Sequence, residues 1–234
     1  MTRYYRQTRM LVAIDCIIFG FDGNDLKLLL IKRGFEPHKG KWSLMGGFVQ
    51  PGQSLDDAAT HTLKQLTGLE GVYMEQLFAF GDPKRDSAER TISVAYFALV
   101  DINQYTQQLN NNNYRAEWVS LKKLPRLIFD HVNMVHLAQE RLRYKAAIHP
   151  ILFELLPARF TLPQLQLLYE AVYDNEFDKR NFSRKVLSTG LLIKLKEKER
   201  TTSKRGAFYY KLDKRKYNAK FDAFLNFITD PGKL

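Results

Sequence analysis

The chain has 234 residues, of which 45% are hydrophobic, a composition typical of globular proteins and a length sufficient for two domains. A single cysteine, Cys16, excludes an internal disulfide framework and a multi-cysteine zinc site, and it favours a reducing compartment. The net charge of +11 lies mostly toward the end, because residues 151–234 contain 17 Lys and Arg against 10 Asp and Glu; this excess is compatible with a polyanionic partner or with a merely solvated basic surface.

The first apolar segment has some resemblance to a targeting sequence. It starts at Leu11, is interrupted by Asp15, and ends at the turn Asp22-Gly23-Asn24-Asp25 after about a dozen residues. A transmembrane helix needs about 20 consecutive apolar residues. We therefore expect a cytoplasmic protein with no membrane partner.

Four apolar segments in the first 150 residues have the composition of strands. The first two flank the Asp-Gly-Asn-Asp turn, which predicts a β-hairpin. The other two lie farther along the chain. The expected strands are Leu11–Phe21, Lys27–Lys32, Leu77–Phe80 and Thr91–Val100.

Two helices are expected among these strands. The first runs from Ser54 to Leu66, because Ser54 and Asp57 form a variant capping box and Gly68 stands at the C-cap position. The second covers Val132–Lys145. Its apolar face would consist of Val132, Val135, Ala138 and Leu142. Strands interrupted by one helix and closed by another predict an α+β sandwich over residues 1–150.

Residues 151–234 have a different pattern, which starts after Pro150. Thr161-Leu162-Pro163-Gln164 is a capping box that opens a helix, and Asp178 caps a second helix, Lys179–Ser188. Gly190 ends that helix, and two strands, Leu191–Lys196 and Ala207–Leu212, flank a basic turn. Helix, turn, helix and a two-stranded basic hairpin predict a winged helix-turn-helix domain.

The second of these helices has the composition of a recognition helix. Helical spacing places Phe182 and Val186 on the inner side, and the basic and polar residues on the other. Such side chains can bind base edges and phosphates of an operator in double-stranded DNA. A solvated helix face next to a charged hairpin is the alternative. The predicted DNA contacts are Lys179, Arg180, Asn181, Ser183, Arg184, Lys185 and Ser188, with Lys204 and Arg205 at the wing tip.

The segment Leu11–Leu69 resembles the Nudix family, and its central part aligns with the family's box without gaps. Gly47 takes the first position, Leu63 the aliphatic one, and Gly68-Leu69 the end. The acids of the box are replaced: Gln53, His61, Thr62, Gln65 and Leu66 stand where the family has Glu, Arg-Glu and Glu-Glu. Nudix hydrolases hold magnesium on these carboxylates to polarise a pyrophosphate and its attacking water. We therefore predict no catalytic residues, no metal, no cofactor and no hydrolase activity. A hydrolase with a displaced metal site, acting on a nucleoside diphosphate derivative, is the alternative.

A degenerate Nudix domain (residues 1–150) followed by a winged helix-turn-helix domain (residues 151–234) resembles the Nudix-related transcriptional regulators. The shared residues are Trp42, Gly46-Gly47-Phe48-Val49, Phe80-Gly81-Asp82-Pro83, Arg85-Asp86, Ser93-Val94-Ala95-Tyr96, Phe129-Asp130-His131 and Lys179-Arg180-Asn181-Phe182. The resemblance implies a homodimeric repressor that a small molecule, bound in the Nudix-like domain, releases from its operator. In regulators linked to NAD metabolism this effector is ADP-ribose or a relative, and in those tied to sugar use it is a free sugar such as arabinose. A regulator of RNA is disfavoured, because the basic half has no stacking-sheet motif or Gly-x-x-Gly clamp.

The sequence does not decide which effector binds in the Nudix-like domain. A diphosphate needs cations, and Arg33, Lys41 and Arg85 are candidates. A neutral sugar needs carboxylates, amides and an aromatic face. For that role the candidates are Asp15, Trp42, Phe48, Gln53 and Asp82, and His61 is a further pocket residue. Asp15 is the most informative, because a carboxylate in an apolar strand requires a partner. The loss of the metal-binding acids favours the sugar slightly.

Overall fold

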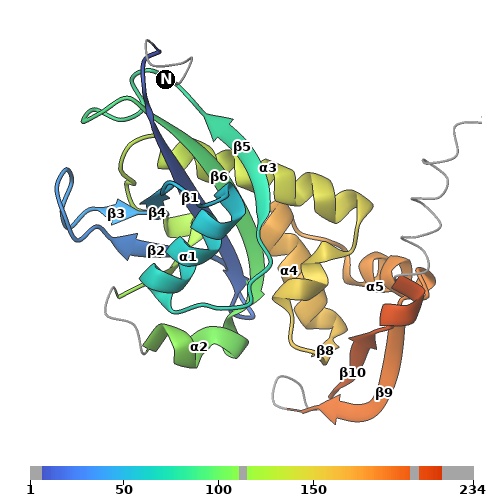
Figure 1. Ribbon diagram of the computed structural model, residues 1–234. Helices are drawn as coiled ribbons and strands as arrows, with labels where there is room; N and C mark the ends of the chain where they lie inside the picture. The colour runs from blue at the N-terminus through green and yellow to red at the C-terminus, as the bar shows by residue number, and fades with distance from the viewer. Residues whose placement is uncertain (1–6, 111–114, 201–205, 218–234) are drawn as a thin grey trace, which may run out of the picture. The chain divides into compact units, whose positions relative to one another are not determined.

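A mixed seven-stranded sheet is the centre of the first part of the chain (Figure 1). The computed structural model describes residues 7–110, 115–200 and 206–217. The strands of this sheet follow the order β3-β2-β1-β6-β5, with β4 paired to β1 and β7 paired to β2. The strands are β1 (Leu11–Phe21), β2 (Leu26–Lys32), β3 (Trp42–Ser43), β4 (Met45–Phe48), β5 (Glu75–Phe80), β6 (Thr91–Asp101) and β7 (Glu117–Ser120).

The two faces of the sheet pack against different helices, and alternate side chains of β1, which pairs in parallel with β6, point to opposite faces. Along β1, Ile14, Cys16 and Ile18 belong to one core cluster, which also contains buried residues of α1 (Leu55–Thr67). Side chains of α2 (Ile102–Asn110) pack against the same cluster. The alternate residues of β1, among them Asp15, face the other side, where α3 (His131–Ile148) contacts β1. The predicted α+β sandwich is confirmed.

Helix α1 begins and ends where its local signals predict. The Ser54 hydroxyl accepts a hydrogen bond from the Asp57 amide at 3.1 Å, and the Asp57 carboxylate accepts one from the Ser54 amide at 3.2 Å. Gly68 adopts φ +76°, a left-handed C-cap. A Cβ on Gly47 would lie 2.5 Å from Thr62 Oγ1, so a glycine at this position lets β4 approach the helix.

The buried face of α3 only partly matches the predicted one. Val135, Ala138 and Leu142 are buried as expected, together with Met134. Val132, in contrast, is 37% exposed, so its assignment to the core was wrong. The buried face starts at His131 instead, the first residue of the helix, which is 3% exposed. Strands β3, β4 and β7 and helix α2 had not been predicted.

The chain divides into two compact units, a first unit, Met1–Leu155, and a second unit, Leu156–Leu234. The division lies a few residues after the boundary expected at residue 150. The reason is a 3-10 helix, Ile151–Leu155, which contacts β1 and β6 and thereby belongs to the first unit.

The second unit contains two helices and a small antiparallel sheet. Helix α4 (Leu162–Tyr173) starts at the predicted capping box of Thr161 and Gln164, and α5 (Lys179–Ser188) starts at Asp178. Strands β9 (Leu192–Glu199) and β10 (Ala207–Leu212) form the predicted hairpin. The expectation of only two strands was wrong, because β8 (Phe160–Thr161) pairs with β10 and makes the order β8-β10-β9. Its two residues are too few for a periodic signal in the sequence.

Candidate functional site

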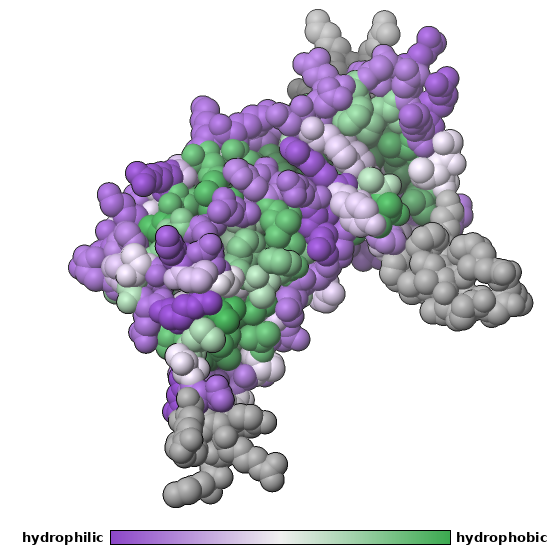
Figure 2. All heavy atoms as spheres, turned by 90° about the horizontal axis from the view of Figure 1, so that it is seen from above, coloured by the Kyte–Doolittle hydropathy of each residue, from purple (hydrophilic) through white to green (hydrophobic). Residues whose placement is uncertain are grey.

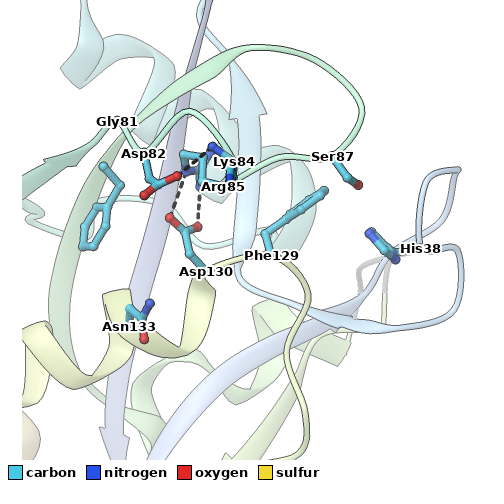
Figure 3. Close-up of a pocket in the computed structure, with 10 residues that line it drawn as sticks. His38, Gly81, Asp82, Lys84, Arg85, Ser87, Phe129, Asp130 and Asn133 are labelled. Atoms are coloured by element: carbon cyan, nitrogen blue, oxygen red, sulfur yellow. Dashed lines mark hydrogen bonds and ion pairs between the residues drawn. The ribbon is translucent and has the colours of Figure 1, made fainter.

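Two adjacent cavities open in the first unit, on the face of the sheet that α3 covers. The larger has a volume of about 510 Å³ and lies between the loop after β5 and the start of α3 (Figure 3). Its wall includes Asp82, Lys84, Arg85, Phe129, Asp130 and Asn133. The smaller, of about 70 Å³, is lined by Asp15, Arg33, Phe35, Phe48, Arg85 and His131, among others. Arg85 and Phe129 line both cavities, so the two form one continuous candidate site.

Arg85 is the central charged residue of this site. Its Nε and Nη2 donate hydrogen bonds to the two carboxylate oxygens of Asp130, at 3.0 and 2.8 Å (Figure 3). Its Nη2 also lies 3.7 Å from Asp15 Oδ2. Only 3% of the Arg85 side chain is exposed, so this bidentate pair is largely shielded from water. Arg85 therefore connects the loop after β5 to both α3 and β1.

Asp15 has the partners that a buried carboxylate requires. The Ser93 hydroxyl on β6 donates a hydrogen bond to its Oδ2 at 2.6 Å. On the other side, His131 Nε2 lies 3.4 Å from its Oδ1. A Cβ on Gly46 would lie 2.5 Å from the same Oδ1, so a glycine is needed at that position of β4. Asp15 is thus enclosed on several sides and fixed in position.

His131 is held as a neutral donor. The Leu44 amide donates a hydrogen bond to its Nδ1 at 3.2 Å, which leaves the ring proton on Nε2, toward Asp15. Burial lowers the pKa of His131, although Asp15 and Asp130 act in the opposite direction. A neutral imidazole with its proton on Nε2 satisfies both contacts at once.

Aromatic side chains border the same site. Phe129 adopts φ +49°, a conformation that costs free energy in a bulky residue and is often associated with function. Its ring contacts His38 edge-on at 5.1 Å between centroids, and the Arg33 guanidinium lies 5.6 Å from its centroid. Arg33 also lies 4.1 Å from the centroid of Phe35, which is 60% exposed. Burial lowers the pKa of Arg33, against the opposing effect of Asp86, Asp15 and Glu36. Arg33 thus lies close to two aromatic rings, Phe35 and Phe129, that line the smaller cavity.

The structure brings together only part of the predicted effector site. Five of the nine residues line one or both cavities: Asp15, Arg33, Phe48, Asp82 and Arg85. Four line neither: Lys41, Trp42, Gln53 and His61. Lys41 is exposed, and the Trp42 ring lies under Lys32 Nζ at 4.9 Å. Gln53 accepts a hydrogen bond from the Gln50 amide and so closes its own loop. His61 is exposed on α1.

Several residues of this site had not been predicted, among them Ser93, Asp130 and His131, and the cavity lining adds Phe35, Lys84, Phe129 and Asn133. The signal was present in the motif Phe129-Asp130-His131, where two titratable residues stand at the start of a helix. Spacing could not show that Asp130 pairs with Arg85, 45 positions away.

The Nudix-like helix offers no comparable cluster. Thr62 is buried against Gly47, and Leu66 is half-buried and packs against the core. Asp57, His61 and Gln65 are exposed on α1, and the Asp57 carboxylate is used by the capping box. Within the described residues, no group of three or more His, Cys, Asp or Glu could hold a metal ion. The chemistry of these donors does not fit magnesium, which requires several oxygen ligands.

In the second unit, α5 presents its polar side outward. Six of the seven residues predicted to contact DNA from this helix are exposed: Lys179, Arg180, Asn181, Arg184, Lys185 and Ser188. Ser183 is half-buried. The inner side packs as expected, with Phe182 buried and edge-on to Tyr169 at 5.5 Å between centroids. Arg184 donates a hydrogen bond to Asn181 Oδ1 at 2.9 Å, so two of these side chains are already ordered relative to each other.

The turn before α5 is fixed by α4. Glu170 accepts a hydrogen bond from the Phe177 amide at 3.0 Å, and Gln166 Nε2 bridges Glu170 and the Phe177 carbonyl at 2.8 Å each. These contacts set the position of α5 relative to α4 through residues outside the exposed face. The unit therefore presents its polar helix on a rigid support.

Strand β9 adds a basic face that sequence reasoning missed. Lys194 and Lys198 lie over the ring of Phe208, with Nζ 3.8 and 4.4 Å from its centroid. Lys196 stands between them at the same period of two and is exposed. The alternation Lys-Leu-Lys-Glu-Lys could have identified this face. The predicted wing-tip residues Lys204 and Arg205 lie outside the described residues.

Comparisons with known proteins agree with this arrangement. Residues 9–138 match the model of the NUDIX domain, and residues 152–212 match that of the NrtR DNA-binding winged helix domain. The ADPR responsive transcriptional repressor NtrR of Acinetobacter baylyi is 32% identical over 221 residues, which are 93% of this chain and 88% of that protein. An ADP-ribose pyrophosphatase of Methanocaldococcus jannaschii is 34% identical over 124 residues, 53% of this chain and 70% of the enzyme. The crystal structure of Shewanella oneidensis NrtR complexed with a 27mer DNA aligns with a TM-score of 0.74 at 29% identity, over 88% of this chain and 95% of that one.

Proposed function

The chain belongs to the NrtR family, in which a Nudix domain precedes an NrtR-type winged-helix domain, and we propose that it is a DNA-binding transcriptional repressor that responds to ADP-ribose. The observation that carries the DNA-binding part is the exposed polar face of α5 in the unit that matches the NrtR winged helix. The Shewanella oneidensis relative is complexed with DNA in its crystal structure. Side chains of α5 read base edges in this proposal, and the lysines of β9 contact phosphates.

ADP-ribose is the effector that we propose, and the cavity in the first unit is its site. The Acinetobacter baylyi relative is described as ADPR responsive. Arg33, Lys84 and Arg85 line the cavities and supply cations for a diphosphate, while Phe35 and Phe129 offer ring faces to a base. This choice departs from the slight preference for a free sugar that the missing acids had indicated.

Hydrolysis is absent in this proposal, although one relative is a pyrophosphatase. Positions 53, 62, 65 and 66 carry no carboxylate, and Thr62 and Leu66 are directed into the packing of α1 rather than toward solvent. Incubation with ADP-ribose and Mg²⁺ or Mn²⁺ should release no phosphate-containing product. Turnover above about 1 s⁻¹, an ordinary enzyme rate, would support the hydrolase alternative instead.

A homodimer is the assembly that we propose. One recognition helix reads only a short half-site, so specificity favours two copies on a palindrome with half-sites about 34–36 Å apart, or a multiple of that spacing. Hydrophobic side chains gather between polar ones on the face shown in Figure 2. Met10, Phe48 and Phe78 of the first unit are 45%, 47% and 58% exposed.

Selection of bound duplexes from a random library tests this proposal, because the operator itself emerges from the selection. We expect enrichment of an inverted repeat, and loss of its binding when ADP-ribose is added at constant salt. The same titration with free ribose and arabinose is the control for a sugar effector. Failure to enrich any sequence would contradict DNA recognition, and release by a pentose alone would replace ADP-ribose as the effector.

A further inference from the structure

The carboxylate of Asp130 has an unusual position for a residue at the start of a helix. Asp130 is the N-cap residue of α3, yet its side chain makes no capping hydrogen bond. Both of its oxygens instead accept hydrogen bonds from Arg85. Asp, Ser and Asn at an N-cap ordinarily bind the amides of the first turn. Asp130 therefore leaves its own helix uncapped and neutralises an arginine of another element (Figure 3).

Arg85 and the two carboxylates that it directly faces carry a negative formal charge together, while the cations Arg33 and Lys84 also line the cavities. One guanidinium faces two carboxylates, Asp130 and Asp15, and the neighbouring imidazole of His131 is held neutral by the Leu44 amide. An anionic ligand that approached Arg85 would meet like charges in a site shielded from water. Binding of a phosphate at Arg85 therefore requires that one carboxylate withdraw.

The two carboxylates differ in their freedom to do so. Asp15 is held by Ser93 and His131 and is covered by Gly46, and only 6% of its side chain is exposed. Asp130 is bound by Arg85, is 16% exposed at the cavity wall, and stands next to the amides of its own first turn. Rotation of Asp130 toward those amides would exchange one set of hydrogen bonds for another.

We propose that Asp130 is an internal competitor for the anionic group of the effector, occupying at Arg85 the place that a ligand phosphate takes when it binds. This inference rests on the proposed response to a diphosphate ligand. Ligand binding then breaks the connection between the loop after β5 and the start of α3, and the released carboxylate caps the helix. Asp130 thus sets the affinity threshold of the site.

The competitor role predicts a gain of affinity on substitution, whereas a direct contact to the ligand predicts a loss. Asp130→Asn keeps the shape of the side chain and a good N-cap, and it removes the competing charge. Asp130→Ser does the same with a smaller side chain and serves if the first variant does not fold. Asp82→Asn is the matched control, because Asp82 lines the same cavity but its carboxylate accepts a hydrogen bond from the Lys84 amide instead of Arg85.

Isothermal titration calorimetry of the full-length variants with ADP-ribose and with inorganic pyrophosphate decides between these roles. We expect Asp130→Asn to bind both about tenfold more tightly than the wild type, with a much smaller change for Asp82→Asn. Unchanged or weaker binding by the Asp130 variants, or an equal gain from Asp82→Asn, would overturn the proposal. If the wild type binds no ADP-ribose, the proposed effector is wrong, and the pyrophosphate titrations still decide the role of Asp130.

Discussion

Arg85 in the first unit and the arginines of α5 in the second unit are in opposite states. Arg85 of the first unit is 3% exposed at its side chain and bound by a carboxylate of its own chain. Arg180 and Arg184 of α5 are exposed, and the contact of Arg184 to Asn181 lies on the same helix. A buried, paired charge contributes to the fold and responds only to a ligand that competes for it. An exposed charge costs little to keep and is available to a polyanion at once, with an affinity that depends on salt.

This difference explains how one chain could combine a ligand-selective site in the first unit with a surface in the second unit that attracts any nucleic acid. In our proposal, a ligand of the first unit must match Arg85 and replace its internal partner, so few molecules qualify. The second unit would attract any nucleic acid through its basic faces, and only the few side chains of α5 that reach base edges would distinguish sequences. The predictions below test whether the two states are as different as the structure indicates.

The largest expected effect is on stability. Arg85→Ala removes the partner of Asp130 and one neighbour of Asp15, and it leaves buried carboxylates uncompensated. We expect a loss of about 3–5 kcal/mol in the free energy of unfolding of the first unit. Arg184→Ala, at an exposed position, should change the stability of the second unit by less than about 0.5 kcal/mol. Urea unfolding monitored by circular dichroism measures both, and similar values for the two variants would remove the distinction.

The coupling between the units is the next largest effect. If ADP-ribose lowers DNA affinity, DNA must lower ADP-ribose affinity by the same factor, with a coupling free energy of about 1–3 kcal/mol. Fluorescence anisotropy with labelled DNA and calorimetry with ADP-ribose give the two factors independently. Equal affinities with and without ligand would mean that the units act separately. An increase of DNA affinity would make the ligand a corepressor.

A similar magnitude is expected for sequence discrimination by α5. Arg180→Ala or Arg184→Ala should lower the preference for the selected operator over a scrambled duplex by about 1–3 kcal/mol, if that residue reads a base. Lys196→Ala on β9 should weaken binding to both duplexes evenly and flatten the salt dependence by about one unit of slope. Equal, small effects from all three variants would show that α5 is not the reading element.

Local signals account for what the sequence predicted well. The bounds of α1, α5 and β10 follow from capping residues, glycines and short-range periodicity, which lie within the element or next to it. Pairings between distant residues had no such signal. Two-residue β8 exists because β10 is beside it, and the contacts of Arg85 with Asp130 and Asp15 depend on the way three elements meet. For that reason, Asp15 was recognised as a residue in need of a partner, but Ser93 and His131 were not identified.

The two capping boxes found in the described part of the chain provide the smallest and most local comparison. At α1 the box pairs Ser54 with Asp57, a titratable residue, and at α4 it pairs Thr161 with the neutral Gln164. Hydrogen bonds from the Ser54 hydroxyl and amide lower the pKa of Asp57 from its ordinary value, against a smaller opposing effect of desolvation. The α1 box therefore depends on pH, while the α4 box does not.

A carboxyl group with a lowered pKa in the folded state stabilises that state above its unfolded pKa of about 3.9 and loses this contribution as the pH falls through the folded value. We therefore expect Asp57→Ala to destabilise the first unit at neutral pH, and the difference from the wild type to shrink as the pH falls below about 4. The difference for Gln164→Ala, measured on the second unit, should stay constant over the same range, because the amide does not titrate. Urea unfolding of the two variants and the wild type between pH 3 and 7 checks both. A pH-independent effect of Asp57→Ala would show that the carboxylate contributes nothing as a charged cap, and that α1 is held by its buried face alone.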